Sequence, residues 1–113
     1  EADLVKIESN IITKIQKNLV KNDTEEIGEF LGIIKLSKNG AKIFLETYDK
    51  LLKSHNGKFQ TADSFKKAFL TDFIQELIDK RISINPILIN GNWLEVDTSQ
   101  DLDNAQERIK NWN

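Results

Sequence analysis

Residues 61–78 read TADSFKKAFLTDFIQELI, and their apolar side chains recur every three or four positions, which is the period of one helix face. That face holds Ala62, Phe65, Phe69, Phe73, Leu77 and Ile78. Thr61 is of a residue type that caps helix N-termini, and Lys66, Asp72 and Glu76 fall on the opposite, polar face. The stretch therefore predicts an amphipathic helix that begins after Thr61 and packs its apolar face on a core.

Two further helices are predicted on either side of this one. The first carries an apolar stripe and ends at His55-Asn56-Gly57; the stripe holds Ala41, Phe44, Leu45, Tyr48, Leu51 and Leu52. The second opens at the end of the chain, where Thr98 and Asp101 form a capping pair. Its apolar stripe holds Leu102, Ala105, Ile109 and Trp112.

Strand signals fill the rest of the chain. Residues 3–8 alternate apolar and charged side chains, residues 29–37 (EFLGIIKLS) predict a buried strand, and residues 84–89 and 93–97 predict a hairpin around Asn90-Gly91. Residues 11–20 fit one face of a helix or a bent strand, and their period does not separate the two. We therefore expect a single mixed α/β domain over residues 1–113, with three main helices.

Composition excludes several classes of function. The net charge is −2, and neither half carries the basic excess that a nucleic-acid or acidic-membrane surface needs. No apolar run is long enough to span a bilayer, and no signal-peptide pattern opens the chain. Cysteine is absent, which removes disulfides and thiolate chemistry. We expect a cytoplasmic protein with no nucleic-acid or membrane partner.

The usual local signatures of catalysis are also missing. The sequence holds no P-loop, no dinucleotide-binding glycine motif and no zinc-protease motif. The single histidine, His55, falls at a predicted helix end, where it is expected to complement the helix dipole rather than to catalyse. Chemistry is therefore sought in residues 93–98, which read WLEVDT.

In a strand over residues 93–97, Glu95 and Asp97 lie on the same face, about 6–7 Å apart along the strand. Two carboxylates at the end of a strand suit a hard cation. The competing interpretation is a half-exposed strand with both acids in water, and spacing alone favours that simpler one.

A resemblance to a known family changes this balance. Residues 90–102, NGNWLEVDTSQDL, with Ala105 after them, resemble the late segment of bacterial nucleotidyltransferases of the sugar-phosphate and choline-phosphate cytidylyltransferase type, including the domains joined to phosphonate-pathway mutases. Residues 29–33, EFLGI, followed by Lys35, Leu36 and Ser37, are similar to a strand of the same family. The resemblance covers most of the chain, and these two segments carry its specificity.

The resemblance implies a partial Rossmann-like layer of nucleotidyltransferase type that transfers a nucleotidyl group, CMP from CTP, to a phosphorylated or phosphonate acceptor. Asp97 matches a family aspartate that binds Mg²⁺, Glu95 is expected beside the acceptor, and Glu29 near the acceptor pocket. The implied partners are a nucleoside triphosphate and a phosphorylated small molecule. For Glu29, an exposed acid before a buried strand is an equally good interpretation.

The departures from the family are as informative. Its Gly-x-Gly-x-Arg nucleotide loop, activating lysine and first metal aspartate belong to an N-terminal half, and none of them occurs here. The sequence also begins at Glu1 and holds no methionine. We therefore expect the C-terminal, acceptor-side portion of a longer enzyme, inactive alone. The alternative is a non-catalytic α/β module that binds a partner or forms a homodimer, with Trp93, Phe30 and Trp112 as apolar anchors.

Overall fold

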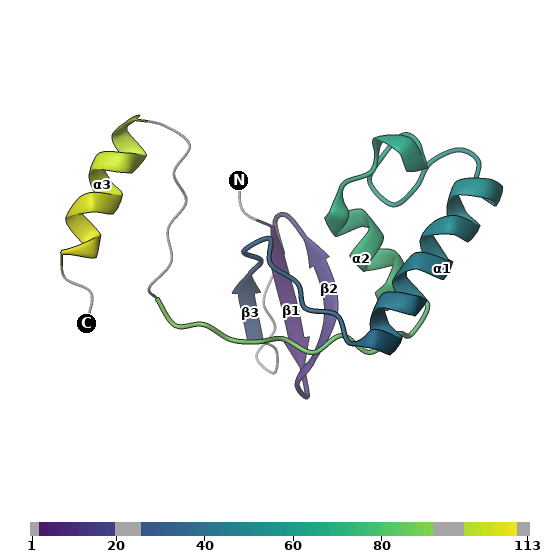
Figure 1. The fold of residues 1–113 in the computed structure, drawn as a ribbon, viewed down its shortest axis with the longest axis horizontal. Coiled ribbons are helices and arrows are strands. Elements are labelled where there is room, and N and C mark those ends of the chain that lie inside the picture. The colour runs from purple at the N-terminus through teal and green to yellow at the C-terminus, as the bar shows by residue number, and fades with distance from the viewer. Residues whose placement is uncertain (1–2, 20–25, 92–98, 111–113) are drawn as a thin grey trace.

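The computed structural model describes residues 3–19, 26–91 and 99–110. Its N-terminal part is a three-stranded antiparallel sheet of β1 (Leu4–Glu8), β2 (Ile11–Gln16) and β3 (Glu26–Glu29), in the order β2-β1-β3 (Figure 1). β1 and β2 are joined at Ser9 and Asn10, both with positive φ, which is the geometry of a two-residue hairpin turn. The ambiguous stretch from residue 11 is therefore a strand up to Gln16.

The described helices follow the sheet along the chain. α1 (Lys38–Ser54) is capped by Ser37, whose hydroxyl accepts a hydrogen bond from the Gly40 N–H at 2.9 Å. A short 3₁₀ turn, η1 (Phe65–Lys67), precedes α2 (Leu70–Asp79), and α3 (Ser99–Ile109) comes last. The mixed α/β class and the three helices are thus confirmed.

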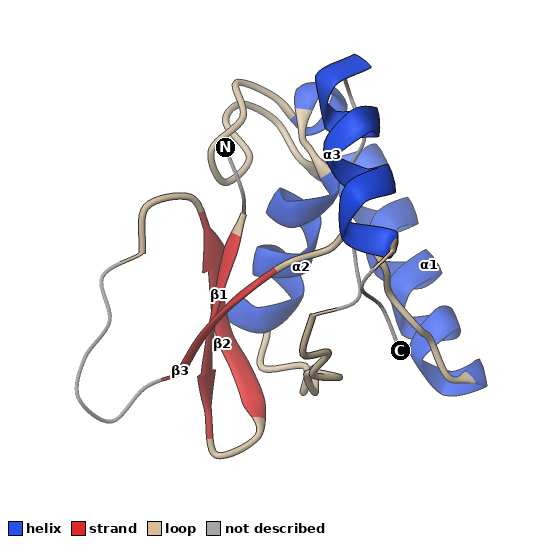
Figure 2. Ribbon diagram, turned by 90° about the vertical axis from the view of Figure 1, so that its left-hand side faces the viewer, coloured by secondary structure: helices blue, strands red, loops and turns tan. Residues whose placement is uncertain are grey.

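α2 lies between the sheet and α1, as Figure 2 shows, and it contributes side chains to two small hydrophobic cores. Ile74 joins Val5, Ile7 and Ile15 of the sheet in the first core. The second core contains Leu51 of α1, Phe59, and Phe73 and Leu77 of α2. The rings of Phe44 and Phe73 pack with centroids 4.5 Å apart, which fastens α1 to α2. α2 is therefore the element that holds the sheet and α1 together.

α2 ends in a hydrogen-bonding pattern that turns the chain back toward β2. The Ile82 N–H donates to the Leu77 carbonyl at 3.0 Å, and the Arg81 N–H donates to the Ile78 carbonyl at 2.9 Å. Arg81 takes the left-handed conformation, with φ of +65°, that this C-terminal motif requires. Residues after it run along the outer edge of β2, where the Ile84 carbonyl accepts from the Ile12 N–H.

The predicted helix over residues 61–78 is wrong in its first half. The α-helix begins only at Leu70, because residues 61–69 form a turn that is bonded to the Asp72 carboxylate. As a result Phe69, predicted to be buried, is 74% exposed, and Asp72, predicted to face water, is 4% exposed.

Two predicted strands are not formed as expected. Of residues 29–37 only Glu29 belongs to a strand, and residues 84–89 are outside any strand in the described part of the chain. The second arm of that predicted hairpin, residues 93–97, lies outside the described residues. In the last helix Ala105 is buried, Leu102 and Ile109 are exposed, and Trp112 lies outside the described residues.

Candidate functional site

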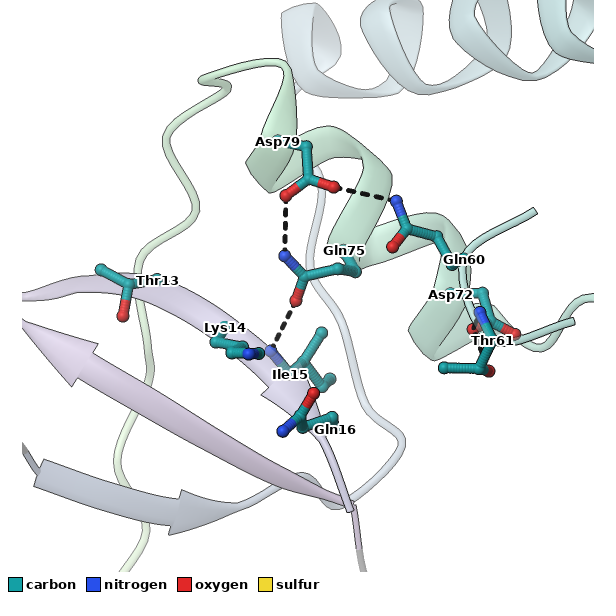
Figure 3. A pocket seen from close by; sticks show the side chains of 9 residues that line it. All are labelled: Thr13, Lys14, Ile15, Gln16, Gln60, Thr61, Asp72, Gln75 and Asp79. Carbon is teal, nitrogen blue, oxygen red and sulfur yellow. Dashed lines mark hydrogen bonds between the residues drawn. The ribbon is translucent and has the colours of Figure 1, made fainter. Parts of the chain in front are cut away.

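A polar cleft of about 480 Å³ lies between the edge strand β2 and the helix α2 (Figure 3). β2 contributes Thr13, Lys14, Ile15 and Gln16, and the loop before η1 contributes Gln60 and Thr61. α2 forms the opposite wall with Asp72, Gln75 and Asp79, three residues on neighbouring turns of one helix face. Segments some sixty residues apart in the sequence therefore meet at this cleft.

Gln75 joins the two walls. Its Oε1 accepts a hydrogen bond from the Ile15 N–H at 2.9 Å, and its Nε2 donates to Asp79 Oδ1 at 2.9 Å. The Ile15 N–H belongs to the outer edge of β2, so the amide of Gln75 takes the place that a further strand would occupy. Thr13 is the extra residue of a β-bulge, since Lys6 pairs with Lys14 but Ile7 pairs with Ile12.

Gln60 extends this network toward the C-terminal end of α2. Its Nε2 donates to Glu76 Oε1 at 2.8 Å and to Asp79 Oδ2 at 2.9 Å, from a backbone with a positive φ of 52°. Glu76 also pairs with Lys80 at 3.7 Å, on the surface of the helix. The two carboxylates are therefore held by amide donors rather than left open toward the cleft.

Asp72 is the most constrained polar group at the site. Its Oδ1 accepts from the Thr61 hydroxyl at 2.6 Å and from the Thr61 N–H at 3.1 Å, and its Oδ2 accepts from the Phe69 N–H at 2.9 Å. Asp72 is the third residue of α2, where a carboxylate also meets the positive end of the helix dipole. Its role is to fix the 61–69 turn against the helix.

The chemistry that this cleft supports is hydrogen bonding rather than metal binding. Lys14 is the cationic residue of the lining, and amide and hydroxyl groups make up most of the rest. Among residues 3–19, 26–91 and 99–110, no three histidine or acidic side chains gather closely enough to hold a metal ion. The Asp72, Gln75 and Asp79 side chains of the lining are thus already hydrogen-bonded within the protein.

Of the acidic residues predicted from the sequence, Glu29 is the one that the structure describes, and it lies away from this cleft. Glu29 is exposed at the end of β3, and β1 separates that strand from β2 and the cleft. Glu95 and Asp97 lie outside the described residues, so their predicted roles stay predictions. His55 caps the C-terminal end of α1, and its Nε2 lies 2.7 Å from the Lys58 carbonyl.

The predicted interface anchors have different placements. Phe30 is partly buried and packs against the sheet core, so its ring is not a free anchor. Trp93 and Trp112 lie outside the described residues. No helix in the described part of the chain is both long and apolar enough to cross a membrane.

Sequence reasoning missed the residues that build the cleft. Gln60 and Gln75 carry no motif, and their partners are distant in the sequence. Asp72 did have a local signal: a carboxylate three residues after Phe69 has the spacing of a helix cap with its third helical residue.

Comparison with known proteins gives one informative similarity. The chain is 26% identical over 105 residues to a CTP:phosphoglutamine cytidylyltransferase of Campylobacter jejuni subsp. jejuni serotype O:2 (strain ATCC 700819 / NCTC 11168). The match covers 91% of this chain but only 39% of that relative. No family model matches the chain, and no solved structure does. A distant cytidylyltransferase-like relationship is therefore supported.

Proposed function

We propose that this chain is the acceptor-side portion of a nucleotidyltransferase that moves CMP from CTP to a phosphorylated or phosphonate small molecule. A phosphate oxygen of the acceptor attacks the α-phosphorus of CTP, the bond from that phosphorus to the bridging oxygen of the β-phosphate breaks, and pyrophosphate leaves. The observation that carries this proposal is the similarity to a cytidylyltransferase along 91% of the chain.

The proposal assigns roles to three acidic residues. Asp97 would supply one carboxylate to Mg²⁺, an ion that in such sites takes one or two carboxylates together with substrate phosphates and water. When bound, Mg²⁺ would neutralise negative charge on the triphosphate. Glu95 and Glu29 would lie near the acceptor.

A single aspartate from this chain fits only a shared metal site. The described residues form no cluster of metal-ligating side chains, and the chain spans only 39% of the relative's length. The other ligands and the groups that bind the triphosphate would come from another part of the polypeptide. The activity is therefore assigned to the whole protein and not to these 113 residues alone.

The test uses the polypeptide at its natural length. It is incubated with each of the four nucleoside triphosphates and a panel of phosphorylated acceptors that includes phosphoglutamine and choline phosphate. Pyrophosphate release is measured by a coupled assay, and the product by ³¹P nuclear magnetic resonance. We expect release with CTP that depends on the acceptor, and in the product the pair of coupled phosphorus resonances of a new phosphoanhydride (P–O–P) linkage.

Two matched variants separate the role of Asp97 from a general loss of charge. Asp97→Asn should lower kcat by about 100-fold or more, because it would remove a ligand of the Mg²⁺ that neutralises charge on the triphosphate. Asp103→Asn removes one exposed carboxylate from α3 and should leave kcat unchanged. Full activity of Asp97→Asn would refute the assignment of the metal. Lack of pyrophosphate release with every acceptor would refute the proposed reaction.

A further inference from the structure

Six large apolar side chains are exposed in two extended segments, residues 31–36 and 84–91. Ile33 is 77% exposed and Ile87 is 75% exposed, and Ile34, Leu36, Leu88 and Ile89 are also exposed. In Figure 1 these segments follow β3 and α2, respectively, and pass the sheet as open coil. Side chains of this size are usually buried in a soluble protein, so their exposure is unusual when they are clustered.

Most of the backbone of the same segments has no hydrogen-bond partner among the described residues, the exception being the Ile84 carbonyl, which accepts from the Ile12 N–H. Among the described residues, no backbone hydrogen bond is made by residues 31–36 or 85–91. Both segments are rich in isoleucine and leucine, residue types that favour or tolerate strands. Extended backbone with free donors and acceptors and apolar side chains is the arrangement that another strand can complete.

We infer that residues 31–36 and 84–91 form an interaction surface that packs against the rest of the same transferase polypeptide, with one or both segments pairing as strands. The inference rests on the proposed function, since it assigns this chain to a longer enzyme. The occupant is the nucleotide-binding portion, because the relative matched over 91% of this chain is much longer than the match.

A second copy of the chain fits the observations less well. An isologous dimer buries one self-complementary patch on each subunit. Here the unpaired segments are about fifty residues apart in the sequence, and α3 adds a further exposed apolar pair, Leu102 and Ile109. Among the described helices and strands, none contacts α3. A larger body that contacts the chain at several places accounts for all of these.

The experiment is hydrogen–deuterium exchange of the polypeptide at its natural length, read by mass spectrometry on peptides that cover both segments. Two regions of the same sample are internal controls. The exposed turn at residues 56–58 should exchange fast, and the interior of α1 should exchange slowly. We expect residues 33–36 and 87–90 to exchange about 100-fold more slowly than the turn, because burial and strand pairing require opening before exchange.

Three results would overturn the inference: exchange in both segments as fast as in the turn, protection that disappears when the protein is diluted to a monomer, or a gene that encodes no polypeptide beyond this chain. The second result would assign the surface to a second copy. The CTP assay tests the proposed function separately. Protected segments without pyrophosphate release would support the interaction surface and refute the proposed function. Pyrophosphate release with unprotected segments would support the proposed function and refute the interaction surface.

Discussion

Asp72→Asn tests whether one buried carboxylate holds the 61–69 turn on α2. The aspartate is 4% exposed and accepts three hydrogen bonds, two from Thr61 and one from the Phe69 N–H. Asparagine has the same shape but only one acceptor oxygen. In either orientation of the amide, its NH₂ group faces a donor. The change therefore removes at least one hydrogen bond to a charged group and leaves a part-buried donor without an acceptor.

The magnitude follows from these contacts. A hydrogen bond to a charged group contributes about 1.5–3 kcal/mol, and an unsatisfied buried group costs about 1–3 kcal/mol. Because the site relaxes in part, we expect the free energy of unfolding to fall by about 2–4 kcal/mol, a large part of the 5–15 kcal/mol that is typical of a domain. With a urea m-value of about 1–3 kcal/mol/M, the midpoint should fall by about 1–2 M.

The assay is urea unfolding followed by circular dichroism at 222 nm, which reports on the helices. Asp63→Asn is the matched control, because Asp63 is exposed and lies in the same turn. That variant should change the free energy of unfolding by less than about 0.5 kcal/mol. If Asp72→Asn costs less than about 1 kcal/mol, or no more than the control, the carboxylate does not hold the turn.

Three further substitutions test single contacts. Gln75→Ala removes the acceptor of the Ile15 N–H and should lower the free energy of unfolding by about 1 kcal/mol, with faster exchange of the Ile15 amide; an unchanged exchange rate would contradict the contact. Arg81→Gly should stabilise the protein by about 0.5–1 kcal/mol in thermal unfolding, because glycine adopts the left-handed conformation without strain, and a lower Tm would argue against that geometry. Ser37→Ala should cost about 1 kcal/mol through loss of the α1 cap, while Ser54→Ala at the other end of α1 should cost less; equal losses would refute the cap.

The 3.6-residue period of apolar side chains predicted a helix correctly where burial of one apolar face determines the local structure. The continuous stripe from Ala41 to Leu52 predicted α1, and its predicted end at His55 is confirmed, whereas its N-cap, Ser37, was assigned to the predicted strand over residues 29–37. The period failed in the stretch before Leu70, where Phe65 and Phe69 continue the apolar spacing but the Asp72 carboxylate binds the backbone in a turn. In that stretch, hydrogen bonds from the backbone to a side chain decided the local structure, although the apolar spacing favoured a helix. The spacing of apolar residues carries no information about such hydrogen bonds.

The strand predictions failed for a different reason, which is that composition does not show whether a partner strand is present. Composition measures how well a residue tolerates extended backbone, but a strand also needs a partner strand. Residues 29–37 and 84–89 have the composition and lack the partner in the described structure. The hairpin that forms turns at Ser9 and Asn10, although Asn90-Gly91 has the stronger turn signal.

The candidate cleft could not have been predicted from local sequence. Gln75 acts through the Ile15 N–H, which is sixty residues away in the chain, and Gln60 acts through α2. Such contacts depend on tertiary packing and leave no fixed spacing. The acids selected from the family resemblance, Glu95 and Asp97, lie outside the described residues, and their roles await the activity test.

The two edges of the sheet differ in whether their backbone groups are already hydrogen-bonded, and this difference decides where a further strand can pair. The outer edge of β2 is closed, because the Ile12 N–H donates to Ile84 and the Ile15 N–H donates to Gln75. In the described part of the chain, no strand pairs with the outer edge of β3. Among the described strands, the edge of β3 is therefore open to direct strand addition, whereas mutation of Gln75 would open part of the β2 edge and allow edge-to-edge aggregation.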